Sequence, residues 1–158
     1  MLYSVTLNKK ALHRLSCFIS LQDNEVPCII DTGCTNTLIP MSFAKEHGKR
    51  LNKTSTVLVG GRSYKVTAYS FDNVYLGGFH IPKMLAFCAD YEDSLKSSVL
   101  LGLNVLNNLE FTITRNKGMM SFNENVWDLL ADKKYPFTVF FEHPDMKPVY
   151  PSLLVEEI

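Results

Sequence analysis

The residue with the clearest chemical potential in this sequence is Asp31, which ends an apolar run. Residues 26–30 read VPCII, a short and mostly apolar stretch that predicts a buried strand leading into the aspartate. A buried aspartate is rare unless it is paired or functional, and Gly33 lets the backbone leave the strand at once. Asp31 is therefore a candidate catalytic acid. At this point the alternative is an Asx-turn that only caps the strand.

Length and charge narrow the class of protein. The chain has 158 residues, with 16 Lys plus Arg and 16 Asp plus Glu. This length predicts one domain with a core of its own, and the balanced charge gives no support for binding nucleic acid or a membrane surface. The N-terminus lacks the pattern of a signal peptide, and no apolar run approaches membrane-spanning length. We therefore expect a soluble, cytoplasmic protein without nucleic-acid or membrane partners.

The cysteines and histidines show no metal-binding pattern. The sequence has four cysteines and four histidines, without C-x-x-C, H-x-H or H-x-x-x-H spacing. Cys17 and Cys28 fall in apolar, strand-like stretches, where a free thiol behaves as a small hydrophobe. We expect all four cysteines to be reduced, with disulfides as the less favoured interpretation, and we expect no metal and no cofactor.

The elements that must position Asp31 are mostly strands. Alternating and short apolar runs predict strands over residues 2–7, 15–21, 26–30, 55–59, 63–70, 74–76, 79–81, 84–88, 99–101, 109–114 and 119–122, and residues 37–39 form a short apolar piece. Short helices are expected over residues 41–47, between Pro40 and Gly48, and over residues 103–108. Gly60 and Gly61 indicate a hairpin turn.

Two apolar strands end on the same kind of signal. Ile29 and Ile30 run into Asp-Thr-Gly, and residues 99–101 run into Gly-Leu-Asn, with the glycine hairpin between the two strands. In this order and spacing, the motifs resemble those of the retropepsin-like aspartic proteases over roughly residues 11–123. The resemblance implies an all-β acid-protease half-barrel with two short helices over residues 1–123, followed by a C-terminal extension over residues 124–158.

The resemblance also implies roles for individual residues. Asp31 would be the catalytic acid, the Thr32 hydroxyl would bond across to a partner loop, and Gly33 would lie where the substrate backbone approaches. Residues 99–102 would support this loop from beneath. The substrate-binding residues would be Gly60, Gly61 and Arg62 at the tip of a flap hairpin, with Leu38 and Ile39 in the cleft wall.

A single Asp-Thr-Gly supplies only one of the two carboxyl groups that the expected mechanism needs. Hydrolysis of a peptide without a metal or a covalent nucleophile needs one carboxylate to deprotonate water and one carboxylic acid to polarise the carbonyl. Two adjacent carboxyl groups can share one proton in this way, as in aspartic proteases generally. The sequence contains a single Asp-Thr-Gly, so the expected enzyme is an aspartic endopeptidase. Its expected active species is a homodimer that pairs Asp31 with its copy and cleaves extended polypeptides.

Some positions depart from the family pattern. Cys34 stands where the family commonly has Ala or Ser. Thr35 and Leu103 stand where viral members often carry an Asp and an Arg that pair at the dimer contact. Both halves of that ion pair are absent together, so no buried charge is left alone. The chain is thus similar to cellular or phage-type members with a more apolar dimer contact.

Three alternatives stay open at this stage. The chain could be a non-catalytic dimerisation or peptide-binding module of the same fold. Cys34 could act as a nucleophile with a histidine from elsewhere in the fold. The extension over residues 124–158 could pack against the domain or its partner, or lie in the cleft as an inhibitory segment, in which case trimming after Phe122 would raise activity.

Overall fold

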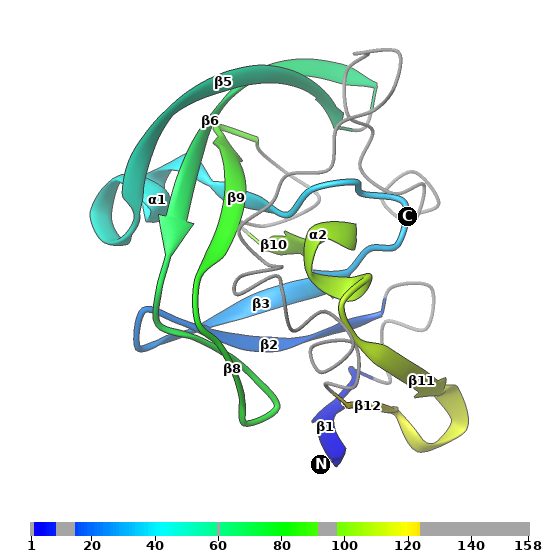
Figure 1. The fold of residues 1–158 in the computed structure, drawn as a ribbon. Helices are drawn as coiled ribbons and strands as arrows, with labels where there is room; N and C mark the ends of the chain where they lie inside the picture. The colour runs from blue at the N-terminus through cyan, green and yellow to red at the C-terminus, as the bar shows by residue number, and fades with distance from the viewer. Residues whose placement is uncertain (1, 9–14, 60, 92–97, 124–158) are drawn as a thin grey trace.

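The computed structural model describes residues 2–8, 15–59, 61–91 and 98–123, which form a predominantly β fold (Figure 1). The strands are β1 (Leu2–Thr6), β2 (Ser16–Leu21), β3 (Asn24–Ile30), β4 (Leu38–Pro40), β5 (Lys49–Val59), β6 (Arg62–Phe71), β7 (Val74–Leu76), β8 (Phe79–Ile81), β9 (Met84–Ala89), β10 (Val99–Leu101), β11 (Glu110–Thr114) and β12 (Met119–Asn123). The helices are α1 (Met41–His47), α2 (Leu103–Leu106) and the 3-10 turn η2 (Arg115–Lys117). The predicted all-β class with two short helices is confirmed.

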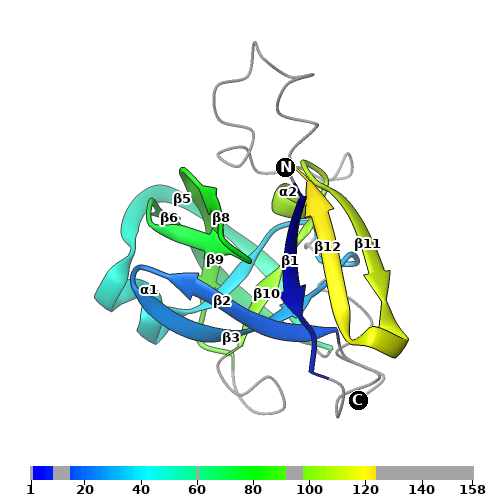
Figure 2. The same cartoon turned by 90° about the horizontal axis from the view of Figure 1, so that it is seen from below.

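The described strands form two sheets. A nine-stranded sheet has the order β5-β6-β9-β4-β10-β3-β2-β7-β8, and a three-stranded sheet has the order β1-β12-β11. In Figure 1 the β5–β6 hairpin arches over the top of the molecule, and in Figure 2 the three-stranded sheet stands beside the β2–β3 hairpin. The short strand β10 lies between β4 and β3 and is hydrogen-bonded on both sides, which explains why its residues are all apolar and buried.

Buried apolar residues gather in two clusters. The main core draws on both sheets and on α2. A smaller cluster joins the inner faces of β5 and β6 to residues that flank the Asp31 loop, and it includes Val57, Val66, Phe87, Ile29, Cys34 and Leu38. The β5–β6 hairpin is therefore packed against the neighbourhood of Asp31, although it lies far from it in sequence.

Most element boundaries agree with the sequence to within two residues, and the start of β5 differs most. Helix α1 has the predicted bounds, but α2 ends at Leu106 and not at residue 108. Strand β5 begins at Lys49, six residues before the predicted start. Residues 49–54 are mainly polar because β5 is an edge strand of its sheet, and a register shift between Arg50 and Thr54 interrupts the pairing with β6. Because of both features, the start of this strand cannot be recognised from the residue pattern alone.

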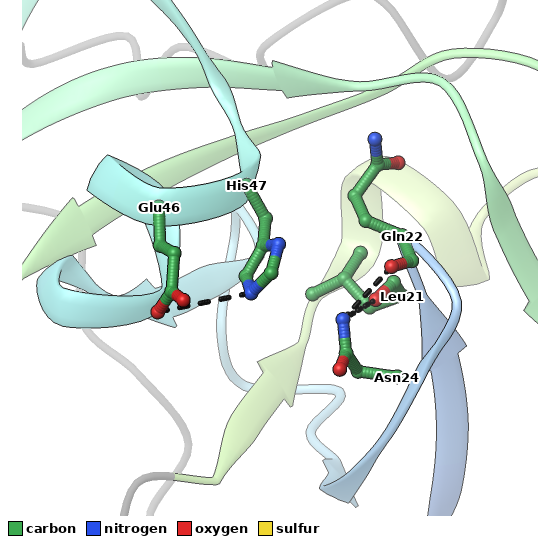
Figure 3. Close-up of polar contacts among 5 residues, drawn as sticks. All are labelled: Leu21, Gln22, Asn24, Glu46 and His47. Carbon is green, nitrogen blue, oxygen red and sulfur yellow. Dashed lines mark hydrogen bonds and ion pairs between the residues drawn. The ribbon is translucent and has the colours of Figure 1, made fainter.

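The turn that joins β2 to β3 is tight and held by side chains. Gln22 and Asp23 both have positive φ, 50° and 66°, as a two-residue hairpin of the primed type requires. The Asn24 amide donates to the carbonyl oxygens of Gln22 (2.8 Å) and Leu21 (3.5 Å) (Figure 3). The Asn73 amide also donates to the Asp23 carboxylate at 2.8 Å. These bonds offset the backbone strain of the turn and set the register of the strand that leads to Asp31.

Several predictions fall outside the described residues. The C-terminal extension over residues 124–158, the flap residue Gly60 and His13 lie there, and the division at residues 123 and 124 stays a prediction. Within the described part of the chain, no helix is long and apolar enough to cross a membrane.

Candidate active site

Asp31 is placed by two adjacent parallel strands. β3 runs parallel to β10, with Leu100 opposite Ile29 and Leu101 opposite Ile30. The pairing continues one step further, because the Asp31 backbone N–H donates to the Leu101 carbonyl at 3.0 Å. Asp31 is fully buried, with 0% of its surface exposed. The predicted support of this loop by residues 99–101 is thus visible as a strand pairing.

Beyond Asp31 the chain turns at once. The Gly33 N–H donates to the Asp31 carboxylate oxygen Oδ1 at 3.2 Å, and the Cys34 N–H donates to the Asp31 carbonyl at 3.1 Å. The first contact is the Asx-turn that the sequence offered as an alternative role. Thr32 and Gly33 are exposed while Asp31 is not. The loop therefore presents backbone and a hydroxyl to solvent, with the carboxylate just beneath.

A buried polar network holds the far end of this loop. The Asn104 side-chain oxygen accepts from the Thr37 backbone N–H (2.8 Å) and from the Thr37 hydroxyl (2.7 Å). The Thr37 hydroxyl in turn accepts from the Gly102 N–H at 3.1 Å, and the Asn104 amide donates to the Leu85 carbonyl at 2.8 Å. The network links the Asp31 loop, the turn after β10 and strand β9. Because all these groups are buried, each bond also satisfies a polar atom that water cannot reach.

Gly102 allows the two loops to touch. A Cβ on this residue would lie 2.6 Å from the Cys34 carbonyl oxygen and 2.9 Å from the Thr37 backbone nitrogen. Both are backbone atoms and cannot swing away as a side chain could. The next residue, Leu103, donates its N–H to the Cys34 carbonyl at 2.8 Å. A glycine after β10 is thus a packing requirement of the Asp31 loop.

Cys34 is poorly suited to act as a nucleophile. Its thiol is fully buried and donates to the Asn36 carbonyl at 2.8 Å. Burial, and next the negative charge of Asp31, raise the pKa of this thiol well above its ordinary value. A nucleophilic cysteine needs the opposite shift, toward the thiolate.

The described histidines lie in other surroundings. His47 on α1 has its Nε2 3.8 Å from the Glu46 carboxylate (Figure 3), and His80 stacks on Tyr75. His13 and His143 lie outside the described residues. No group of three or more His, Cys, Asp and Glu residues in the described ranges is placed to hold a metal ion.

The predicted substrate-binding residues differ in how exposed they are. Gly60 lies outside the described residues. Gly61, with φ of 80°, and Arg62 are exposed at the β5–β6 hairpin. Leu38 and Ile39 are buried in β4, with 1% and 0% of their surfaces exposed. Their role in the walls of a cleft stays a prediction.

Sequence reasoning missed the polar residues that shape the site. Asn104 and Thr37 lie within the motifs, but the motifs alone predict no structural role for either residue. A signal was present, because Asn104 is a single amide within an otherwise apolar run, and buried polar side chains are usually hydrogen-bonded. Tyr91 was missed as well: its hydroxyl donates to the Ser98 carbonyl (2.5 Å) and contacts the Leu38 carbonyl (3.4 Å), tying the chain after β9 to β4 and β10.

Comparison with known families agrees with this geometry. The sequence profile of a family described as "gag-polyprotein putative aspartyl protease" matches residues 4–108, about two thirds of the chain. The match includes Asp31 with its loop, the β5–β6 hairpin and the β10–α2 turn. The chain belongs to the retropepsin-like aspartic protease family. The predicted family is thereby confirmed.

Solved structures place this retropepsin-like chain among similar folds. It is similar to a retropepsin-like aspartic protease from Rickettsia conorii, with 16% sequence identity and a TM-score of 0.54 over 77% of this chain and 98% of the other. At that identity the likeness shows the fold. The EIAV protease, solved with the inhibitor HBY-793, gives 20% identity and a TM-score of 0.49 over 60% of this chain and 86% of its own. A comparison with curated protein sequences gives no match.

Proposed function

We propose that this retropepsin-like chain is an aspartic endopeptidase whose catalytic dyad forms from Asp31 of two identical subunits. The observation that carries the proposal is the placement of Asp31: a fully buried carboxylate at the end of β3, under an exposed Thr32 and Gly33. The exposed Thr32 and Gly33 give this loop a surface that a second copy and a substrate can approach, and the proposal requires the Asp31 carboxylate beneath it to become accessible there.

The proposed reaction needs both carboxyl groups. One Asp31, ionised, takes a proton from water, and the water oxygen attacks the carbonyl carbon of the scissile peptide bond. The other, protonated, donates its proton to the carbonyl oxygen. Collapse of the tetrahedral intermediate breaks the C–N bond, and the amine leaves with a proton returned from the dyad. Two carboxyl groups held close together can share one proton, which makes this division of roles possible.

The proposed flap is the β5–β6 hairpin. Its tip carries Gly61 and Arg62, and residues along its inner face, Val57 and Val66, pack into the apolar cluster that contains Cys34. A substrate in extended conformation would lie between this hairpin and the Asp31 loop.

The arrangement of β12 bears on how two copies could join. If the family resemblance extends to the dimer contact, the terminal strand of the domain would join a sheet across the dimer. Here β12 already pairs with β1 on one side and β11 on the other. Within the described strands, only the outer edges of β1 and β11 are open in this sheet. A partner strand in this proposal would therefore add to one of those edges.

The test compares Asp31→Asn with the wild type on a denatured protein mixture between pH 4 and 8, with the new peptide ends mapped. Asp90→Asn is the matched control, because Asp90 is exposed and the substitution removes the same charge. We expect the cleavage rate of Asp31→Asn to fall by roughly 100-fold or more, as on removal of an acid–base group. The cleavage rate of Asp90→Asn should stay at the wild-type level. Equal cleavage by Asp31→Asn would contradict the proposal. A wild type that dimerises without cleaving would support the non-catalytic module.

A further inference from the structure

Arg62 belongs to the face of the β5–β6 hairpin that packs toward the Asp31 loop. On this inner face, Val66 is buried in the apolar cluster beside the loop, and Tyr64 packs against the same cluster. The register pairs Tyr64 with Val57, which is also buried in the cluster. Side chains alternate between the two faces of a strand, and Arg62 stands two residues before Tyr64 on β6. The backbone of β6 therefore directs Arg62 to the inner face.

Lys65 lies on the opposite, outer face of the same strand. It pairs with Thr56, and both residues are exposed. Arg62 and Lys65 are three positions apart, an odd number, so their side chains leave β6 on opposite sides. The strand thus carries two exposed cations of the same charge, one on each face. Lys65 therefore provides a matched control for Arg62.

Arg62 has no carboxylate partner within its own hairpin. Residues 49–71 contain five Lys and Arg and no Asp or Glu, although the whole chain has 16 residues of each charge. Among the described residues, no ion pair involves the Arg62 side chain, which is exposed. A guanidinium group stays charged at neutral pH, so water solvates it in the free protein. The charge is therefore available to a ligand.

A substrate under the hairpin would displace this water. Removing water from a charge without supplying a partner is costly, and an apolar or basic side chain next to Arg62 supplies none. A carboxylate supplies two oxygens that can accept parallel hydrogen bonds from the guanidinium group. On the described part of the inner face between residues 55 and 66, Arg62 is the one charged side chain. The inner face therefore selects for an acidic side chain at this point.

We propose that Arg62 determines substrate specificity, and that the favoured substrates are extended polypeptides with Asp or Glu close to the scissile bond. This inference rests on the proposed endopeptidase, in which the substrate lies between the hairpin and the Asp31 loop. A dimer of two identical subunits brings two copies of Arg62, one on each side of its axis. Acidic residues are therefore favoured on both sides of the bond that is cut.

The test maps the cuts that the full-length chain makes in a denatured protein mixture. We expect Asp and Glu to be enriched within about four residues of the cut, because an extended chain advances about 3.4 Å per residue and soon leaves the reach of one long side chain. One mapped peptide is then synthesised twice, with its acidic residue and with the isosteric amide. The amide should lower kcat/KM about 10-fold, the effect of one charge-assisted hydrogen-bonded pair.

Variants of the two cations identify the residue responsible. Arg62→Gln should cleave the acidic and the amide peptide at similar rates, and Arg62→Glu should favour cuts close to Lys or Arg. Lys65→Gln removes the same charge from the outer face and should keep the wild-type preference. Both positions are exposed, so neither change leaves a buried group unpaired. A reversed preference in Arg62→Glu requires contact with the substrate, which a purely structural role of Arg62 would not produce.

The contrary results can be told apart. Cleavage by the wild type without enrichment of Asp or Glu would overturn the role of Arg62 and leave the proposed endopeptidase in place. An equal loss of preference in Lys65→Gln and Arg62→Gln would also overturn it, because the overall charge of the hairpin would then set the preference. A wild type that cuts nothing would contradict the endopeptidase itself, and with it this inference.

Discussion

Asn104 ties together three parts of the chain that lie far apart in sequence. Its side-chain oxygen accepts hydrogen bonds from the backbone N–H and the hydroxyl of Thr37, and its side-chain N–H donates to the carbonyl of Leu85. Thr37 extends the link to the Gly102 N–H. At the scale of single residues, the shape of the Asp31 loop therefore depends on polar atoms that have no access to water, where a missing partner costs more than a formed bond contributes.

The first prediction concerns the Thr37 hydroxyl. Thr37→Val keeps the shape of the side chain but removes the acceptor of the Gly102 N–H and one donor to Asn104. We expect a loss of about 1–3 kcal/mol in the free energy of unfolding, the usual cost of a buried unpaired polar group. Urea denaturation measures it. Thr37→Ser keeps the hydroxyl and loses one methyl group, so a Ser variant that is as unstable as the Val variant would contradict the role of these hydrogen bonds.

At the scale of elements, the β7–β8 hairpin joins the large sheet to β1 of the small sheet. Its turn residues Gly77 and Gly78 both have positive φ, 54° and 85°. They differ in surroundings: a Cβ on Gly77 would lie 2.3 Å from the Ser4 carbonyl oxygen, and one on Gly78 would meet nothing within 4 Å. Only Gly77 is in close contact with the backbone of β1.

This difference gives the second prediction, which compares Gly78→Ala with Gly77→Ala. Gly78→Ala should cost about 1 kcal/mol of stability, for an alanine held at positive φ. Gly77→Ala should cost roughly 1–3 kcal/mol more, because the added methyl group forces the hairpin away from β1. Thermal and urea unfolding of the two variants measure the difference. Equal losses would mean that the contact with β1 adds nothing.

At the scale of the whole molecule, buried protonated groups link stability to pH. Burial is the main cause that raises the pKa of Cys34, Cys88 and Tyr91, and for Cys28 it follows the hydrogen bond with Cys17. In the unfolded chain these thiols titrate near pH 8.5 and the phenol near 10. Above those values the unfolded state has lost protons that the folded state keeps, so rising pH favours unfolding.

The third prediction is therefore a loss of stability at alkaline pH. The contribution of each buried thiol is fully present below about pH 8.5 and falls by up to about 1.4 kcal/mol per pH unit above it, until the folded pKa is reached. Urea denaturation between pH 7 and 10.5 should show this slope. Cys88→Ala removes one such group and should make the slope shallower by about that amount. An unchanged slope in this variant would show that Cys88 ionises equally in both states.

The fourth prediction tests whether the proposed active species contains two Asp31 residues. Asp31→Asn subunits should pair with wild-type subunits and inactivate them, because a mixed dimer holds one aspartate. With a fourfold excess of the variant, random pairing leaves about one fifth of the wild-type chains active. Cleavage rate after mixing and re-equilibration measures this fraction. The same excess of Asp90→Asn should raise total activity, and a wild type unaffected by Asp31→Asn would show that one chain suffices.

The sequence by itself determined the local features of this protein. The end of β3 at Asp31, the hairpins, the bounds of α1 and the glycine-ended β10 all follow from residue periodicity and from proline and glycine positions. These signals are local, because each arises within a strand, a turn or a helix end. The family likeness rested on the same motifs, and the match over residues 4–108 confirms it.

Only the tertiary structure decided how these pieces meet around Asp31. The parallel pairing of β3 with β10, the bonds from Asn104 to residues 67 and 19 positions away, and the burial of Leu38 and Ile39 depend on sheet order. Sheet order is set by long-range packing, which a local pattern does not encode. For the same reason the polar start of β5 was missed, since its pairing with β6 and not its own composition makes it a strand.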